Sequence, residues 1–367
     1  MSLPTLADAA PIWDPGHDDT LVCVAVWAET HDVMTFVFEA QTPRRFAYRP
    51  GQFMTFEVET FQVELAGQTP HRCYTLSSSP TRPDRISITV KRSGPVSTWL
   101  HQTLRPGVSL KALGPMGDFT CADHPAAKYL FLSAGSGITP LMSMTRAFHD
   151  LASAADIAFV HSARTPDDLI FGAELALMAR RTPGLKVTTL CEADAPGTAW
   201  NGYRGRLDLA RLALIAPDFL EREVFVCGPG PYMAAVREML AGAGLDATRY
   251  HQESFDFAEL VAEDPGALYL DPPTAEMTQV ETFQVQFTAS RRTIACAGDG
   301  FVLQAAKAAG MRLPSSCTKG MCGACKSRLV SGTVDMTPAG GIRQREIDQG
   351  LILICCAKPT SDLVIER

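Results

Sequence analysis

The stretch Cys317-Thr-Lys-Gly-Met-Cys322-Gly-Ala-Cys325, followed by a fourth cysteine at Cys355, decides the fold of the last part of the chain. The spacing C-x4-C-x2-C with a distant fourth cysteine is typical of a 2Fe-2S cluster held by four thiolates. Glycine and alanine stand between the cysteines, where the backbone must pass close to the cluster. Zinc sites more often contain two C-x2-4-C pairs, so this spacing fits zinc poorly. The stretch therefore predicts a 2Fe-2S cluster.

The fourth ligand is either Cys355 or its neighbour Cys356. The run Cys355-Cys-Ala-Lys-Pro359 resembles the C-x-A-x-P with which the plant-type ferredoxin pattern ends. This resemblance implies that Cys355 completes the cluster. It also implies that residues 281–367 form an α+β ferredoxin domain of the β-grasp type.

Composition restricts the remaining possibilities. The chain is 46% hydrophobic and 20% charged, and no apolar run approaches the length of a membrane span. The first residues have neither a basic group nor a long apolar core, so we expect no signal peptide. Eleven cysteines, an odd number, argue against a disulfide framework and suit a reducing compartment. A net charge of -7 argues against binding to nucleic acid, whose phosphates attract basic surfaces. We expect a cytoplasmic monomer.

Hydrophobic patterns divide the chain into several units. After a loosely held lead-in at 1–19, alternating apolar segments separated by turns predict an antiparallel β-barrel over 20–122. Apolar strands followed by glycine turns and helical segments predict a parallel, helix-flanked α/β sheet over 123–256. Turn-forming residues without periodicity predict a linker at 257–280. The ferredoxin domain at 281–367 completes a multidomain fold.

A flavin motif lies in the predicted barrel. Arg72-Cys-Tyr74-Thr75 follows a strand that begins Pro50-Gly-Gln-Phe, and the combination resembles the flavin motif of the ferredoxin-NADP reductase superfamily. A guanidinium can clamp phosphate, a phenol ring can stack on the isoalloxazine, and a hydroxyl can bond to its N5 atom. The resemblance implies these three roles for Arg72, Tyr74 and Thr75. Taken alone, the segment could also be an ordinary strand with an exposed arginine.

Two later segments support the flavin assignment. Residues 94–98, Gly-Pro-Val-Ser-Thr, place a glycine turn and hydroxyl groups at a helix start, where backbone N–H groups can receive a phosphate. In the superfamily this element seats the flavin pyrophosphate, and residues 114–119, Gly-Pro-Met-Gly-Asp-Phe, resemble the corner that ends the flavin domain. The resemblance implies FAD, while FMN, used by a related branch, stays open. The implied flavin-binding residues are Arg72, Cys73, Tyr74, Thr75, Val90, Lys91, Val96, Ser97 and Thr98.

Two glycine turns indicate a nicotinamide nucleotide site. Residues 135–140, Gly-Ser-Gly-Ile-Thr-Pro, follow a predicted strand and open a helix, which is the geometry that holds a pyrophosphate. They resemble the G-x-G-I-T-P of the superfamily, and residues 227–233 resemble its C-G-P-x-x-[MF] loop. Such turns can be plain connections, but their spacing from each other and from the flavin motif favours a site. The implied residues are Gly135, Gly137, Thr139, Pro140, Arg164, Cys227, Gly228, Pro229 and Met233.

The resemblance also implies a polar set around the path of hydride transfer. In the superfamily the cysteine of the second loop lies beside the nicotinamide, and an acidic residue near the final aromatic approaches the flavin N5. These positions correspond here to Cys227 and Glu253, and with Thr75 they form the predicted catalytic set. Glu253 could also be a solvated glutamate that precedes the linker.

The sequence gives two indications about the coenzyme. Arg164 and Ser162 follow a predicted strand without an acidic residue at its end, which favours the 2'-phosphate of NADPH. Reductases with an arginine before a segment like Asp168-Leu-Ile-Phe171 mostly use NADH, and this resemblance leads us to expect NADH. NADPH stays open.

The predicted cofactors form an electron path that leaves the chain. A nicotinamide releases two electrons as hydride whereas a 2Fe-2S cluster accepts one at a time, so the flavin stands between them. We find no Rieske ligand pair and no obvious 2-His-1-carboxylate triad at which the path could end. The C-x-x-H at Cys121 to His124 has no upstream C-x-H, and we assign the remaining histidines no role. An acceptor protein is therefore expected.

The order of these domains resembles that of the reductase components of Rieske-type oxygenases. The segment 250–255, Tyr-His-Gln-Glu-Ser-Phe, resembles more closely the reductases that serve quaternary-ammonium demethylases such as glycine betaine monooxygenase. This implies a terminal oxygenase as the partner. Two alternatives stay open. The acceptor could be a hybrid-cluster protein or a membrane desaturase, or the chain could be a redox sensor whose cluster state controls binding to a partner.

Overall fold

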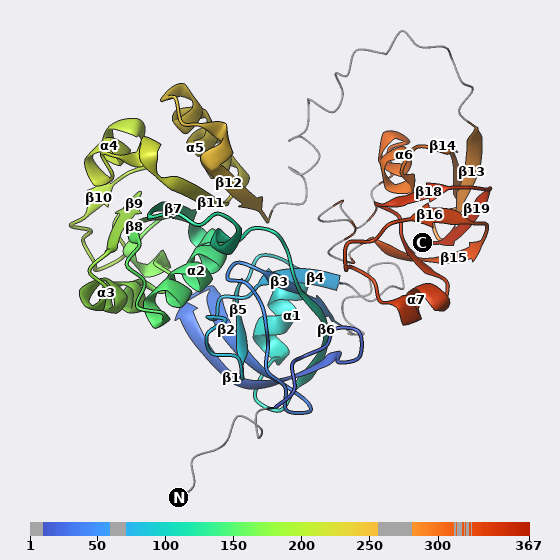
Figure 1. Ribbon diagram of the computed structural model, residues 1–367, viewed down its shortest axis with the longest axis horizontal. Helices are drawn as coiled ribbons and strands as arrows, with labels where there is room; N and C mark the ends of the chain where they lie inside the picture. Colours follow the sequence, from blue (N-terminus) through green and yellow to red (C-terminus); the bar gives the residue numbers. More distant parts are fainter. Residues whose placement is uncertain are drawn as a thin grey trace, which may run out of the picture.

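The computed structural model describes residues 10–58, 71–255, 281–311, 313, 318, 320, 323 and 325–367. Its strands form three large sheets, each drawn from a separate part of the chain, and one two-stranded ladder (Figure 1). The linker predicted at 257–280 and the predicted cluster ligands Cys317 and Cys322 lie outside the described residues.

The first sheet is antiparallel throughout, with strand order β4-β3-β6-β1-β2-β5. An isolated antiparallel bridge between Leu76 and Ile88 connects the two edges, so the sheet curls toward a barrel and hides edge groups that would otherwise be unpaired. Its strands are β1 (Thr20–Thr30), β2 (Val33–Ala40), β3 (Phe53–Glu57), β4 (His71–Thr75), β5 (Ile86–Lys91) and β6 (Ser109–Met116).

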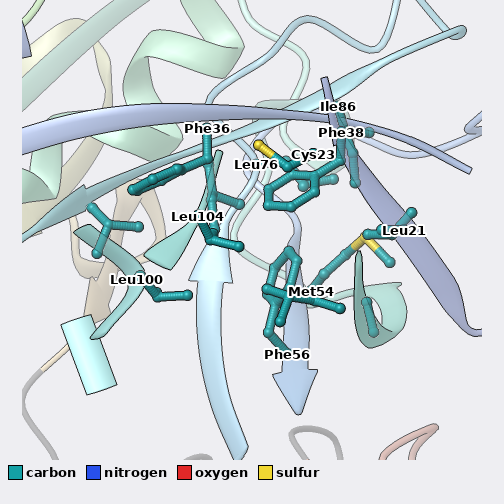
Figure 2. Packing of buried hydrophobic residues seen from close by; sticks show 14 of the residues in the cluster. Leu21, Cys23, Phe36, Phe38, Met54, Phe56, Leu76, Ile86, Leu100 and Leu104 are labelled. Carbon is teal, nitrogen blue, oxygen red and sulfur yellow. The ribbon is translucent and has the colours of Figure 1, made fainter. Parts of the chain in front are cut away.

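Alternating side chains of these strands fill the barrel. Phe36 and Phe38 of β2 are separated by one residue and therefore point to the same face, where they meet Phe56 of β3 (Figure 2). The helix α1 (Pro95–Thr103) adds Leu100 to this cluster, and Leu104 follows at its end. All five side chains are buried, which explains the period-two pattern of the sequence.

The second sheet is parallel throughout, with strand order β10-β9-β8-β7-β11-β12. Strand β7 lies between β8 and β11, so the strand order reverses there and a ligand crevice is expected at the carboxyl ends. The elements are β7 (Lys128–Ala134), α2 (Ile138–Asp150), β8 (Asp156–Ala163), α3 (Gly172–Arg181), β9 (Leu185–Cys191), β10 (Tyr203–Arg204), α4 (Leu209–Ile215), β11 (Glu223–Gly228), α5 (Gly230–Gly242) and β12 (Tyr250–Ser254).

Both faces of this parallel sheet are covered. Phe131 and Phe225 belong to an apolar cluster on one face, whereas Leu130, Leu132 and Val226 belong to a separate cluster on the other. Since alternate residues point to opposite faces and both are buried, the strands appear in the sequence as continuous apolar runs.

The third sheet is mixed, with strand order β14-β13-β19-β15-β17. Strand β13 runs parallel to β19 and antiparallel to β14, and α6 packs Val302, Leu303 and Ala306 into the core beneath the sheet. The elements are β13 (Thr282–Phe287), β14 (Arg292–Ala297), α6 (Val302–Ala308), β15 (Lys326–Ser331), β16 (Val334–Met336), α7 (Gln344–Asp348), β17 (Leu351–Leu353), β18 (Ala357–Pro359) and β19 (Leu363–Glu366).

The predicted fold class is confirmed: an antiparallel barrel-like sheet, a parallel α/β sheet and a C-terminal α+β unit follow one another along the chain. Among the described helices, none has both the length and the apolar character that a membrane span requires.

Candidate functional site

The predicted flavin strand is β4 at one edge of the barrel sheet. Arg72 and Tyr74 alternate with Cys73 and therefore share a face of the strand. Tyr74 packs against the barrel core, with its ring centroid 6.0 Å from that of Phe56, and burial raises its pKa above the ordinary value. The phenol therefore stays neutral, which suits an aromatic surface for stacking.

The start of α1 provides the predicted phosphate seat. His101 donates from Nε2 to the carbonyl oxygen of Val90 at 2.8 Å and so holds the helix beside β5. The hydroxyl of Ser97 accepts hydrogen bonds from the N–H groups of Ser93 and Gly94, each at 2.9 Å. Ser97 therefore shapes the turn, and the backbone N–H groups of the first helical turn, together with Thr98, are the donors that suit a phosphate here.

Other predicted flavin residues lie around this turn. Val90 and Val96 are buried beneath it, and the Lys91 ammonium lies 3.4 Å from a carboxylate oxygen of Asp32. This seat is attached to the barrel rather than to the nucleotide sheet.

The two glycine turns touch each other. A Cβ atom at Gly137 would lie 2.3 Å from the carbonyl oxygen of Cys227 and 2.5 Å from the backbone nitrogen of Gly228, so only glycine fits. Thr139 donates its hydroxyl to the carbonyl of Ser136 at 3.1 Å, which closes the turn before α2. The resulting narrow backbone cradle at the ends of β7 and β11 suits a pyrophosphate.

The other predicted nucleotide residues flank this cradle. Pro140 is buried in the first turn of α2, and Pro229 precedes α5. Met233 is buried in the core cluster below α5. Arg164 follows the end of β8 and is exposed.

The three predicted catalytic side chains converge. Cys227 of β11 pairs directly with Glu253 of β12, and a hydrogen bond joins the hydroxyl of Thr75 to the carboxyl group of Glu253. Glu253 Oε2 is shielded from solvent and has no hydrogen-bond partner among the described residues. Burial raises the pKa of Glu253 to about 8, against the opposite effect of Thr75, and burial also raises the pKa of Cys227. The unpartnered oxygen fits a polar ligand atom at this junction.

Contacts that the sequence does not reveal hold the barrel against α2. Ser143 donates its hydroxyl to the carbonyl of Ser78 at 2.7 Å, and Arg146 donates to the carbonyl of Ser77. The Arg146 guanidinium also pairs with Glu174 at 2.6 Å. The sequence signal that could have indicated these contacts was a serine and an arginine, Ser143 and Arg146, in a helix whose other residues are mostly apolar.

A buried histidine at the end of β8 is a second group missed from the sequence. His161 Nδ1 lies 2.8 Å from the hydroxyl of Ser133, whereas its Nε2 has no partner within the described ranges. Burial lowers the pKa of His161 to about 4, so the ring is neutral. Its free nitrogen near the crevice fits a nucleotide better than an apolar ligand.

Two predicted cluster ligands lie together. Cys325 and Cys355 are both buried, and a hydrogen bond from Cys325 is the main cause that lowers the pKa of Cys355. The backbone N–H of Gly320 donates to Cys355 Sγ at 3.3 Å, and Gly320 has a φ of 73°, which favours glycine. Cys356 Sγ instead lies 3.6 Å from the carbonyl oxygen of Leu353. Both sulfur atoms lie near Gly320, since a Cβ there would be 2.9 Å from Cys356 Sγ. Cys355 is the more buried of the two and accepts the Gly320 N–H, which fits its predicted role as a ligand.

The C-terminal unit contacts the barrel through Arg343. Its guanidinium donates to the carbonyl oxygens of Pro15 at 2.6 Å, Ala112 at 2.9 Å and Asp18 at 3.3 Å. Gly323 of the cluster loop, together with Thr55 and Leu113 of the barrel, lines a small cavity beside Arg343. Gly323 therefore lies on the side of the C-terminal unit that faces the barrel.

Comparison with known proteins agrees with this division of the chain. A 2Fe-2S iron-sulfur cluster binding domain matches residues 285–360, an oxidoreductase NAD-binding domain matches 131–238, and an oxidoreductase FAD-binding domain matches 23–121. The glycine betaine monooxygenase reductase subunit of Pseudomonas aeruginosa is 45% identical over 355 residues, which are 94% of each chain. The chain belongs to the reductase subunits of oxygenase systems.

Two further relatives cover nearly all of this reductase. The stachydrine N-demethylase reductase subunit of Rhizobium meliloti is 41% identical over 350 residues, covering 95% of this chain and 96% of the relative. The structure of phthalate dioxygenase reductase, 22% identical, has the same fold with a TM-score of 0.54 and covers 95% of this chain and 97% of its own. The sequence-based prediction of a reductase with FAD-binding, NAD-binding and 2Fe-2S domains is confirmed.

The raised pKa of Glu253 predicts a pH effect. Because the folded-state pKa of about 8 exceeds the ordinary 4.5, the native protein holds a proton that the unfolded chain releases between these values. Stability should therefore fall as the pH rises from 4.5 to 8, and the Glu253→Gln variant should lose this contribution. Thermal unfolding across this range measures it. An equal loss of the slope in Glu238→Gln, an exposed position on α5, would contradict this assignment.

The arrangement of Cys355 and Cys356 predicts different outcomes for two neighbouring substitutions. Cys355→Ser should abolish the visible absorption and the reduced-state electron paramagnetic resonance signal of the cluster, because it removes the buried thiolate that accepts the Gly320 N–H. Cys356→Ser should keep both signals. The reverse pattern would assign the fourth ligand to Cys356.

Proposed function

We propose that this reductase takes electrons from NADH and delivers them, through FAD and the 2Fe-2S cluster, to a Rieske-type terminal monooxygenase that demethylates a quaternary ammonium compound. The proposed substrate class rests on the sequence similarity to reductase subunits named for glycine betaine and stachydrine, which extends over 94% or more of both chains. Both named substrates are N-methylated quaternary ammonium acids.

The chain's own side chains would organise hydride transfer at the junction of barrel and nucleotide sheet. When bound, FAD accepts two electrons as hydride and the cluster passes them on singly. With Glu253 protonated, its O–H would donate to the Thr75 hydroxyl oxygen, which would leave the single Thr75 proton to be donated toward flavin N5. Cys227 would pack beside the nicotinamide. The carboxyl group of Glu253, protonated near neutral pH, orients Thr75 without placing a negative charge beside the incoming hydride.

The remaining binding roles rest on the sequence motifs and, for the described residues, agree with the positions of the side chains. Arg72 and the start of α1 would hold the flavin pyrophosphate, and Tyr74 would stack on the ring system. The cradle between Gly137 and Gly228 would hold the nucleotide pyrophosphate. Four thiolates, from Cys317, Cys322, Cys325 and Cys355, would hold the cluster.

The surroundings of Arg164 support NADH as the donor. Its guanidinium pairs with Asp168 at 2.6 Å and lies 3.8 Å from Asp32. Asp168 is the main cause that raises the pKa of Arg164, so the arginine keeps its charge but shares it with two carboxylates. A 2'-phosphate would have to approach both of these negative groups, which disfavours NADPH.

The acceptor would be a separate protein, and we propose that the reductase acts in the cytoplasm as a monomer. One chain contains the FAD-binding, NAD-binding and 2Fe-2S domains, so the electron path needs no second copy.

Reconstitution tests the proposal. Purified reductase, NADH and a glycine betaine-type terminal oxygenase should convert glycine betaine with release of formaldehyde, since hydroxylation of an N-methyl group leads to its loss. Omitting the reductase should abolish the product. NADH-dependent reduction of ferricyanide without any product from glycine betaine or stachydrine would refute the substrate class and leave the reductase activity intact.

The Arg164 environment predicts coenzyme preference. We expect kcat/KM to be higher for NADH than for NADPH. Arg164→Ala should lower kcat/KM for NADPH by about tenfold or more, because it removes a charged contact worth roughly 1.5–3 kcal/mol, and should change the NADH value little. Arg180→Ala, at an exposed position on α3, is the matched control. A strong preference of the unmodified enzyme for NADPH would overturn the assignment.

A further inference from the structure

Three metal-ligand side chains meet near the amino-terminal ends of β11 and β12, at the far end of β11 from its glycine turn. His124 comes from the connection that leads into β7, Glu223 opens β11, and His251 lies in β12. Their ring nitrogens and a carboxylate oxygen lie within 4.8 Å of one another. Residues this far apart in the sequence show no metal-binding spacing, so the set emerges only from the fold.

The sheet register assembles this set. His251 of β12 pairs with Phe225 of β11, and Glu223 stands two residues before Phe225 in β11. The side chains of His251, Phe225 and Glu223 therefore point to the same face of the sheet. His251 Nε2 lies 2.6 Å from Glu223 Oε1. The His124 and His251 rings are 3.8 Å apart at 32°, and the Phe225 ring lies 4.7 Å from His251. The apolar ring forms one wall of the set.

Burial and charge favour a cation here. The Glu223 side chain is 16% exposed and that of His251 is 15% exposed, and within the described part of the chain His251 is the ion-pair partner of Glu223. A second group, His31 with Asp32 and Asp168, already has Arg164 2.6 Å from Asp168 and Lys91 3.4 Å from Asp32. Those resident cations compete with a metal.

We propose that His124, Glu223 and His251 bind a divalent transition metal of the zinc type, with one further position for water. Two imidazole nitrogens and a carboxylate oxygen are a common zinc donor set. Metal–ligand distances of about 2.0–2.2 Å place tetrahedral ligands roughly 3.3 Å apart. The hydrogen bond between His251 and Glu223 therefore opens by less than about 1 Å to admit the ion.

The ion joins three segments that differ in origin. His124 belongs to the connection between the barrel and the nucleotide sheet, Glu223 belongs to β11, and His251 belongs to the neighbouring edge strand β12. Glu253 follows His251 by two residues and points to the same face of β12. The metal therefore braces the strand that carries Glu253, and its role is structural.

Zinc titration of the intact protein tests the site. The holoprotein, with FAD and cluster present, is treated with EDTA, exchanged into chelator-free buffer and titrated with ZnCl2 by calorimetry. We expect about one ion per chain and a higher melting temperature at saturation. Absorption of the cluster should not change. No saturable binding, or bleaching of the cluster during binding, overturns the proposal.

Variants separate this site from adventitious binding. Glu223→Gln keeps a hydrogen-bond partner for His251 but lacks the charge, and it should raise the zinc Kd at least about tenfold, as should His251→Gln. His31→Ala disrupts the other histidine–carboxylate group and should leave zinc binding unchanged. If both site variants bind zinc with the affinity of the unmodified protein, or if His31→Ala loses zinc binding, the zinc lies elsewhere and the site is refuted.

Discussion

The hydrogen bond between Thr75 and Glu253 joins two sheet edges that belong to different units. Strand β4 ends the barrel sheet and β12 ends the nucleotide sheet, so the catalytic junction forms where these two edge strands meet. A carboxylate placed there would need a cation or several donors, whereas a protonated carboxyl group needs fewer partners. In the proposed function the groups along the hydride path meet at this neutral contact, and Ser143 and Arg146 hold the barrel against α2 beside it.

Much of the fold was predictable because local patterns determine it. Phe36 and Phe38 alternate with half-buried residues on one wall of the barrel, whereas Leu130 to Leu132 form a continuous apolar run because both faces of the parallel sheet are covered. Gly137 was also predictable, since a Cβ at this position would meet the backbone of Cys227. These features depend on neighbouring residues or on a short motif, so they leave a signal in the sequence.

The features that could not be predicted all join distant segments. Glu253 appeared in the sequence as either a catalytic or a solvated residue, and only the register of β12 against β11 places it beside Cys227. The grouping of His124, Glu223 and His251 could not be predicted for the same reason, because the two histidines approach each other through the fold rather than through sequence spacing. Side-chain chemistry is visible in a sequence, but the third dimension decides which groups share a site.

The contact made by Arg343 has an uneven chemistry. On the C-terminal side it is one guanidinium, whereas on the barrel side it consists of main-chain carbonyl oxygens at Pro15, Asp18 and Ala112. Every amino acid carries such a carbonyl, so substitutions in the barrel can vary freely without removing the acceptors. The Arg343 contact is in this sense generic, whereas the neighbouring ion pair between Arg345 and Asp19, at 2.8 Å, depends on a side chain. A different ferredoxin unit grafted onto the same barrel would need an arginine for the carbonyl groups and a cation for Asp19.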